Sequence, residues 1–274
     1  MKDPCFFSII TPVFNLIEGK REKRLFEALD SIHNQSFKNF EHIVVDGNST
    51  DGTVALLNGL MSDKYKFKFI SEPDTSVYDA MNKGVALSSG QYILFLNSDD
   101  YYHDLTCLQK IHDFIGNDQI DYIITPINTV TSKNSKPIRV RLWRIFLNMP
   151  FGHPGLIVSR IFFDSLHGFD KKFRIAGDYD FSIRALLAQS RNKKFDYSFV
   201  TFRQGGLSSN RDVIADEKRI IWQKNFGKYG LSNDDCDYML RTRRLPILIA
   251  FKIFADKYLP LRIRFYALRH ILLP

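Results

Sequence analysis

The 274-residue chain is poor in cysteine, glycine and proline, and each shortage excludes a class of protein. Its three cysteines, Cys5, Cys107 and Cys236, are far apart, and no two have the spacing of metal ligands. An odd number of scattered cysteines argues against a disulfide framework or a zinc site and predicts three reduced thiols. The 15 glycines and 10 prolines are too few for a collagen-like or low-complexity chain. A chain with 45% hydrophobic and 25% charged residues is expected to be globular with a large core.

Long apolar runs are also missing. None approaches the ~18 residues that a membrane-spanning helix needs. The apolar stretch 5–14 is interrupted by Ser8, Thr11 and Pro12, which is not the pattern of a signal peptide. We therefore expect the chain to stay in the cytoplasm.

Two common nucleotide-binding patterns do not occur. No Gly-x-Gly-x-x-Gly follows the first apolar run, which argues against a dinucleotide-dependent dehydrogenase. The absence of Gly-x-x-x-x-Gly-Lys-Ser/Thr argues against a P-loop enzyme. A nucleotidyltransferase is disfavoured as well, because the first predicted loop, Thr-Pro-Val-Phe-Asn at 11–15, lacks both the glycines and the Lys or Arg expected there.

What the first hundred residues do contain is an alternation of short apolar runs and segments with helical spacing. The runs predict strands at 6–13, 42–46, 67–71 and 92–96, and the spacing predicts helices at 25–32, 53–60 and 77–87. Unbroken apolar strands are typical of a parallel sheet covered by helices on both faces. We predict an α/β fold built on a Rossmann-like, mostly parallel sheet.

The second half of the sequence is less regular. Helical spacing recurs over 105–115 and again from 176 to about 189, and short apolar runs at 122–126 and 156–158 predict strands. Residues 139–146 fit a strand or a helix, and both alternatives stay open.

Polar side chains follow each of the first four predicted strands. In parallel sheets, ligands bind at the carboxyl ends of the strands, so these side chains are candidates for a site. Asp99 and Asp100 would repel each other unless a cation joined them, and hard oxygen ligands suit Mg²⁺ or Mn²⁺ shared with substrate phosphates. Asp46 is a candidate acceptor for a nucleobase N–H. The alternatives are turn residues for these three, and a helix N-cap rather than a general base for Asp178.

The C-terminal segment 241–274 differs in charge from the rest. It contains eight Lys and Arg against one acid, Asp256, and so holds seven of the eight formal net positive charges. Twenty of its 34 residues are apolar, which favours helices at a membrane interface over a nucleic-acid-binding tail. The side chains expected to face acyl chains are Leu248, Phe251, Ile253, Phe254 and Tyr258. The alternative is a helical subdomain packed on the body of residues 1–240.

Taken together, the motifs resemble those of the family-2 glycosyltransferases, inverting enzymes of the GT-A fold, and most of all the bacterial branch that builds lipopolysaccharide, O-antigen, capsule and exopolysaccharide. The resemblance covers roughly residues 6–210. It rests on Phe-Ser-Ile-Ile-Thr-Pro-Val-Phe-Asn at 7–15, Ile-Val-Val-Asp-Gly-Asn-Ser-Thr-Asp-Gly-Thr at 43–53, Val-Tyr-Asp-Ala-Met-Asn-Lys-Gly at 77–84, Gly-Gln-Tyr-Ile-Leu-Phe-Leu-Asn-Ser-Asp-Asp at 90–100 and Gly-Asp-Tyr-Asp-Phe at 177–181.

The resemblance implies a role for each matching position. Asp99 would bind Mn²⁺ or Mg²⁺ on the diphosphate of a UDP-sugar, and Asp178 would be the catalytic base. The residues implied in nucleotide-sugar binding are Pro12, Asn15, Asp46, Asp79, Lys83, Asn97, Ser98 and Asp100. The implied reaction inverts the anomeric centre, and the implied partners are a UDP-sugar donor, a glycan acceptor on a polyprenyl diphosphate and the cytoplasmic face of the inner membrane.

Two positions depart from the family pattern. Asn97 stands where the first Asp of Asp-x-Asp is usual, so this residue is expected to be a polar contact only. Gly177 stands where a Glu usually precedes the base, which leaves Asp180 as a rival to Asp178. His153 is expected to be a structural residue of a turn. A non-catalytic nucleotide-sugar-binding protein on the same fold is the alternative function.

Overall fold

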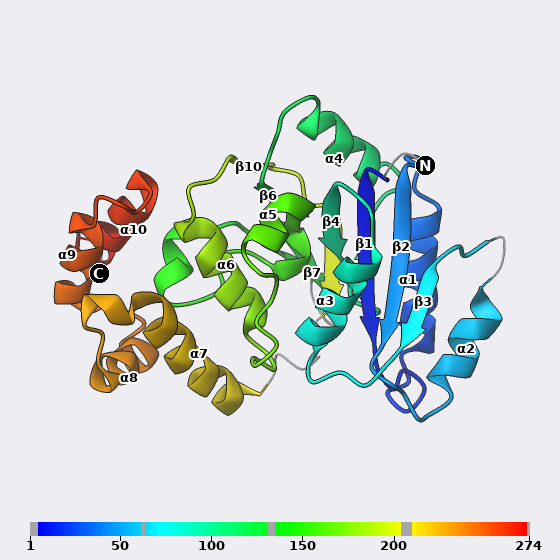
Figure 1. The fold of residues 1–274 in the computed structure, drawn as a ribbon, viewed down its shortest axis with the longest axis horizontal. Coiled ribbons are helices and arrows are strands. Elements are labelled where there is room, and N and C mark those ends of the chain that lie inside the picture. The colour runs from blue at the N-terminus through cyan, green and yellow to red at the C-terminus, as the bar shows by residue number, and fades with distance from the viewer. Residues whose placement is uncertain (1–4, 62–63, 131–134, 204–209, 273–274) are drawn as a thin grey trace.

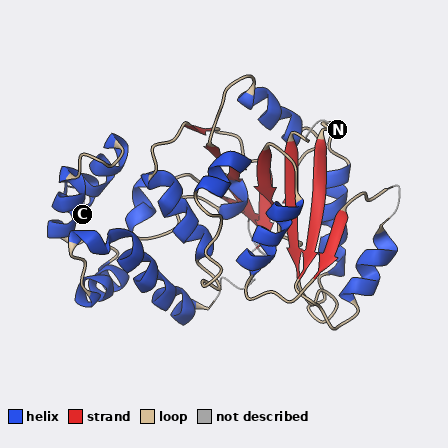
Figure 2. Cartoon of the chain, in the orientation of Figure 1, coloured by secondary structure: helices blue, strands red, loops and turns tan. Residues whose placement is uncertain are grey.

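Seven strands form the larger of two sheets in the computed structural model, which describes residues 5–61, 64–130, 135–203 and 210–272 (Figures 1 and 2). The strand order is β10-β6-β9-β4-β1-β2-β3. Every neighbouring pair is parallel except the two pairs of β9, which is antiparallel to β4 and β6. The strands are β1 (Phe7–Val13), β2 (Phe40–Asp46), β3 (Lys68–Ser71), β4 (Tyr92–Phe95), β6 (Tyr122–Ile124), β9 (Leu156–Ser159) and β10 (Asn192–Lys194). The predicted α/β fold with a mostly parallel sheet is confirmed.

Helices cover the two faces of this sheet because successive strand side chains point to opposite sides. Ile10 of β1 packs in one core cluster with α3 (Val77–Leu87). Val44 of β2, on the other face, packs with Leu25 and Leu29 of α1 (Glu22–His33). The shorter helices α2 (Thr53–Leu60) and α4 (Cys107–Ile115) complete this half of the chain (Figure 1).

A proline in a central strand needs an explanation, because proline has no N–H to donate to the ladder. The carbonyl of Ile10 accepts from Leu96 on the β4 side, whereas the carbonyl of Val13 accepts from Gly47 on the β2 side. By alternation, the missing N–H of Pro12 faces the β4 side. Since β4 ends at Phe95, opposite Ile10, Pro12 costs the sheet no hydrogen bond.

A second sheet, which the sequence did not predict, has the order β5-β11-β7-β8. Its strands are β5 (Tyr101–Tyr102), β7 (Ile127–Val130), β8 (Ser135–Ile138) and β11 (Val200–Arg203). They are two to four residues long and mix polar with apolar side chains, so periodicity does not reveal them. The ambiguous segment 139–146 contains the 3₁₀ helix η1 (Leu142–Phe146), and the turn at 152–155 contains η2 (His153–Gly155).

The rest of the chain is helical. α5 (Arg160–Ser165) and α6 (Gly177–Leu187) pack near the sheet, and α7 (Arg211–Phe226), η4 (Gly227–Tyr229) and α8 (Asn233–Thr242) extend away from it (Figure 1). Local capping explains two of the starts. The Asn210 side chain accepts from the N–H of Val213 at the start of α7, and Ser232 and Asp235 form a reciprocal capping box at the start of α8.

The C-terminal helices α9 (Ile247–Ala255) and α10 (Leu261–Leu272) pack on each other, and α10 also packs on η1 and α9 on η4. Ile249, Ile253 and Ile263 are buried in the core cluster that also contains residues of α6 and β4. The expectation that Ile253 faces lipid is therefore wrong. Leu248, Phe251 and Tyr258 are exposed as expected, at 74%, 50% and 76%, and Phe254 is half-buried. Residues 273–274 of the predicted tail lie outside the described part of the chain.

Among the residues that the structure describes, no helix combines the length and the apolar character needed to cross a membrane.

Candidate active site

The loops that follow β1, β2 and β3 meet at one edge of the sheet. A Cβ atom placed on Gly47, directly after β2, would lie 3.2 Å from both the Phe14 ring and an Asp74 carboxylate oxygen. Asn15 links the first two loops, since its backbone N–H donates to Ser49 Oγ (2.8 Å) and its Oδ1 accepts from the N–H of Thr50 (3.1 Å). Asn15 has φ +43°, a left-handed conformation that asparagine tolerates better than most residues.

Asp46 is the last residue of β2 and is fully buried. Its Oδ2 accepts from the N–H of Ser49 (2.8 Å) and from Ser71 Oγ (2.7 Å), and its Oδ1 accepts from Ser49 Oγ. A carboxylate offers about four acceptor positions, so these three bonds fix its orientation and leave room for one more donor.

Lys83 on α3 lies among carboxylates. Its Nζ donates to Asp74 Oδ1 at 2.6 Å and lies 3.9 Å from Asp79 Oδ2 and 3.8 Å from Glu72 Oε2. Asp79 also accepts from the backbone and hydroxyl of Thr75. Burial raises the pKa of the Asp74 carboxyl, although the Lys83 charge opposes it. Lys83 thus holds the loop after β3 against α3.

The loop 97–100 after β4 presents one of its two carboxylates and encloses the other. Asp100 is fully buried, accepts from Asn97 Nδ2 (2.9 Å) and from the N–H of Arg203 (2.9 Å), and burial, with the neighbouring Asp99 charge, raises its pKa to about 7. The side chain of Asp99 remains 17% exposed, with Arg24 Nη1 at 3.9 Å. Ser98, in the same loop, is buried.

Arg203, the last residue of β11, holds this loop in place. Its backbone N–H donates to Asp100, its Nη1 donates to the carbonyl oxygen of Asp99 (2.8 Å), and its Nη2 pairs with Glu27 of α1. The sequence did not single out Arg203, because the contact joins residues more than a hundred positions apart.

Asp178 lies in the first turn of α6, and its surroundings are polar but uncharged or aromatic. The Tyr78 hydroxyl lies 3.0 Å from Asp178 Oδ1 and 2.6 Å from the carbonyl oxygen of Ile175, so these two acceptors share one proton. Burial raises the pKa of the Asp178 carboxyl above its ordinary value; the nearby His153 and the Tyr78 hydroxyl oppose that rise.

His153 connects Asp178 to the end of β4. Its ring stacks on Phe95, the last residue of β4, with centroids 5.5 Å apart, and meets Phe169 edge-on. Burial lowers the pKa of the imidazole. Its Nε2 is buried and has no hydrogen-bond partner among the described residues. The Asp178 side chain is therefore placed near the same end of the sheet as the loop 97–100.

Asp180, the rival candidate, has a different environment. Its carboxylate is completely buried and accepts from Arg184 Nε (2.8 Å), Lys224 Nζ (3.0 Å) and Asn225 Nδ2 (3.2 Å). Two cations and an amide hold it in the interior between α6 and α7. Asp180 thus joins helices, whereas Asp178 stays half-buried with neutral donors.

This arrangement of strand-end carboxylates agrees with what comparison with known proteins finds. The sequence model described as "Glycosyl transferase family 2" matches residues 8–177. The chain belongs to glycosyl transferase family 2. It is therefore an enzyme that transfers glycosyl groups, as its motifs predicted, and its fold is the GT-A fold.

Relatives and solved structures support this membership. The chain is 32% identical over 217 residues to the PGL/p-HBAD biosynthesis glycosyltransferase of Mycobacterium bovis, covering 77% of this chain and 81% of the relative. The fold is similar to that of S. aureus TarS (TM-score 0.64, 19% identity), of which it covers 43%, with 97% of this chain aligned.

Two ligand-bound structures have the same fold. TarS 1–349 in complex with UDP-GlcNAc gives a TM-score of 0.63 at 19% identity, covering 97% of this chain and 88% of that one. The mannosyltransferase PcManGT from Pyrobaculum calidifontis, in complex with GDP-Man and Mn²⁺, gives 0.62 at 12% identity, covering 99% and 87%. At these identities the likeness establishes the fold only.

In this family-2 enzyme, a steric reason explains why a glycine stands at position 177, directly before Asp178. A Cβ atom on Gly177 would lie 2.7 Å from Cδ2 and 2.9 Å from Cε2 of Tyr78. The Tyr78 ring thus occupies the space that a side chain at 177 would need. The hydroxyl of the same tyrosine reaches Asp178.

The contact made by Glu217 of α7 was also not predicted from the sequence. Its carboxylate accepts three backbone N–H groups in a row, those of Arg174 (2.5 Å), Ile175 (3.0 Å) and Ala176 (2.7 Å). This clamp fixes the loop that leads into Asp178. A single glutamate in a helical pattern carries no signal for such a contact.

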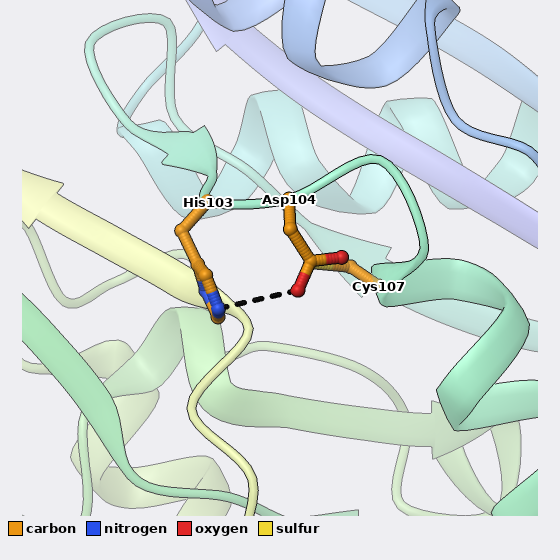
Figure 3. A group of neighbouring side chains, drawn as sticks. All are labelled: His103, Asp104 and Cys107. Carbon is orange, nitrogen blue, oxygen red and sulfur yellow. Dashed lines mark ion pairs between the residues drawn. The ribbon is translucent and has the colours of Figure 1, made fainter.

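His103, Asp104 and Cys107 form a group with the spacing of metal ligands, but the site does not fit a metal (Figure 3). Asp104 already accepts from Lys110 Nζ (2.9 Å) and Tyr197 Oη (2.6 Å), and these bonds, with Thr106, lower its pKa although burial opposes them. Burial raises the pKa of the Cys107 thiol, which disfavours the thiolate that a metal needs.

Proposed function

We propose that this enzyme transfers a sugar from a UDP-sugar to a hydroxyl group of a glycan acceptor on a polyprenyl diphosphate, with inversion at the anomeric carbon, in the assembly of a surface polysaccharide. The observation that carries the proposal is the contrast between Asp178 and Asp180. Asp178 is half-buried with a raised pKa, and no cation of the described residues is bound to it, as a general base requires. Asp180 is paired with Arg184 and Lys224.

The donor site is proposed at the ends of β1, β2 and β4. Asp46 retains acceptor capacity for the N–H of a uracil ring, and Pro12 and Asn15 shape the loop beside it. Asp79 and Lys83 border the same edge and would lie at the ribose and phosphates. Binding of UDP-GlcNAc to TarS, which has the same fold, supports a uridine nucleotide as the donor.

Asp99 is the residue that would hold a divalent cation. Its carboxylate is partly exposed and is a hard oxygen donor, and within the described part of the chain its only ion pair is with Arg24 at 3.9 Å. This donor fits Mg²⁺ or Mn²⁺, with the remaining ligands coming from the diphosphate, and Mn²⁺ in the complex of PcManGT supports the choice. A cation bound there would neutralise the charge of the departing UDP. Asn97, Ser98 and Asp100 would orient the loop rather than coordinate.

The proposed chemical step needs only one base. Asp178 takes the proton from the acceptor hydroxyl while that oxygen forms a bond to the anomeric carbon and the bond to the β-phosphate oxygen breaks. One displacement converts an α-linked donor into a β-linked product. Tyr78 and Glu217 hold the base in its position before the substrate arrives.

We further propose that residues 241–274 attach the GT-A domain of residues 1–240 to the membrane surface that carries the acceptor. Ile247, Leu248 and Phe251 of α9 and Leu261 and Phe265 of α10 are between 50% and 74% exposed. The rings of Phe254 and Phe265 lie 6.0 Å apart, so the exposed faces of the two helices adjoin. Apolar side chains surrounded by Lys and Arg are suited to an anionic interface.

The test is turnover of UDP-Glc, UDP-Gal, UDP-GlcNAc and UDP-GalNAc with Mn²⁺, together with UDP calorimetry. At least one donor should be hydrolysed, and Asp178→Asn should lower kcat by roughly 10²-fold or more without weakening UDP binding. Asp212→Asn, an exposed Asp on α7, is the matched control and should behave as wild type. Wild-type turnover by Asp178→Asn would refute the assignment of the base.

A further inference from the structure

A cavity of about 470 Å³ lies between η1, α7 and α8, away from the strand ends that form the donor site. Its apolar floor is made by Leu147, Trp222 and Met239. The two helices that frame it lie together at the lower left of Figure 1. We call this cavity the basic pocket, because four of its eleven lining residues are cations: Arg144, Arg211, Lys218 and Arg243.

Among the residues that the structure describes, no carboxylate lines the basic pocket, and none of its four cations forms an ion pair within 4.0 Å. Other cations of α7 behave differently. Arg219 pairs with Asp216 and Asp237, and Lys224 pairs with Asp170 and Asp180. On α7, the two cations without an ion pair among the described residues, Arg211 and Lys218, thus both border the pocket.

These cations are close enough to affect one another. Burial lowers the pKa of Lys218 to about 8, and the charges of Arg243 and Arg144 add to that shift. The pKa of the Arg144 guanidinium is also lowered, by burial and by the charges of Arg141 and Arg243. The ammonium group of Lys218 has one polar contact, to Asn148 Oδ1, which is neutral. Arg243 has φ +57°, a helix-end conformation that favours glycine, so a long cationic side chain stands at an unfavourable backbone position.

The basic pocket is joined to the loop that carries Asp178. Lys218 follows Glu217, whose carboxylate binds the N–H groups of Ile175 and Ala176. Trp222 of the pocket floor donates from Nε1 to the hydroxyl of Tyr179 at 3.0 Å. An anion in the pocket would therefore lie beside the residues of α7 that contact the chain on both sides of Asp178.

We propose that the basic pocket binds a phosphate or diphosphate group, and that this group belongs to the acceptor. Arg and Lys side chains without an ion-pair partner among the described residues are suited to phosphate oxygens, and the apolar floor suits the first carbons of a lipid attached to them. The inference that the phosphate belongs to the acceptor rests on the function proposed above. The inference that the pocket binds a phosphate group is independent of that function.

Calorimetry on the full chain, in EDTA and with saturating UDP, tests the proposal with inorganic pyrophosphate and farnesyl diphosphate as probes. Lys218→Gln and Arg243→Gln should each weaken binding by about tenfold, the size of one charge-assisted hydrogen bond. Arg219→Gln, whose cation is paired, is the matched control and should not change it. UDP affinity should be the same in all variants, so a failed pocket and a failed donor site are told apart.

The two probes also separate the sources of the phosphate. Farnesyl diphosphate binding tighter than pyrophosphate, and lost in Lys218→Gln/Arg243→Gln, supports a lipid-linked acceptor. Displacement of pyrophosphate by phosphatidylserine vesicles, but not by farnesyl diphosphate, would overturn the acceptor assignment in favour of a membrane headgroup. Equal pyrophosphate affinity in wild type and the double variant, or no binding at all, would overturn the pocket itself. Lys218→Gln removes an unpaired, half-buried charge, so it should not unfold the chain.

Discussion

Replacing Gly177 with alanine should strain the contact between α6 and Tyr78. The added Cβ would lie 2.7 Å from Cδ2 of a ring that is 5% exposed. The ring cannot withdraw without moving its hydroxyl away from Ile175 and Asp178. Overpacking costs about 1–3 kcal/mol and a lost hydrogen bond about 1 kcal/mol, so we expect a loss of roughly 2–4 kcal/mol in the free energy of unfolding.

Urea denaturation measures this loss as a lower midpoint at unchanged slope. The matched control is Gly59→Ala in α2, where a Cβ would meet nothing within 4 Å and the variant should gain about 0.5–1 kcal/mol. Combining Gly177→Ala with Tyr78→Leu should cost less than the sum of the single changes, because the clash is relieved. Activity should stay low in the double variant, which lacks the hydroxyl. A Gly177→Ala midpoint equal to wild type would refute the steric reasoning.

Three further predictions concern the base, the metal and the tail. Because burial raises the pKa of Asp178, kcat/KM should fall on acidification at a pH above the pKa of an ordinary Asp. At neutral pH Asp178→Asn should not lower Tm, whereas Asp180→Asn should, because Asp180 is paired with Arg184. The reverse order of the two Tm values would contradict this. Asp99→Ala should abolish the tightening of UDP binding by Mn²⁺ in calorimetry, and equal UDP affinity of the wild type in EDTA and Mn²⁺ would exclude the metal role. Phe251→Ser should reduce flotation with phosphatidylserine vesicles, more so in high salt, while the exposed Ile220→Ser on α7 should not; equal flotation of both variants would reject attachment through α9.

The first half of the fold was predictable because its signals are local. The helix expected at 77–87 has those bounds, since Ser76 caps its start and its apolar residues recur at helical spacing. The strands at 42–46 and 67–71 begin within two residues of the observed ones. The orientation of β9 was not predictable, because an apolar run of four residues does not encode its direction.

In the candidate site too, the local features were predictable and the long-range contacts were not. The carboxylates at strand ends were found from the sequence because a parallel sheet brings those ends together. Tyr78, Arg203 and Glu217 contact residues that are far away in the sequence. The separations are 100 positions for Tyr78 and Asp178, 103 for Arg203 and Asp100, and 42 for Glu217 and Ile175. No periodicity or spacing encodes such contacts. The basic pocket was missed for the same reason, since its cations come from three separate helices.

The contact of Glu217 with the loop before Asp178 has a consequence for the two proposed tasks of the enzyme, donor binding and acceptor activation, which fall on different stretches of chain. The family match ends at residue 177, one position before Asp178, and the glutamate that holds the Asp178 loop comes from α7, beyond the match. The loops proposed to bind the donor, by contrast, all lie within the first hundred residues. The proposed nucleotide site and the support of the proposed base are therefore encoded by separate parts of the chain. On these proposed roles, exchanging α7 and the helices after it would leave the nucleotide site intact and alter the surroundings of the base.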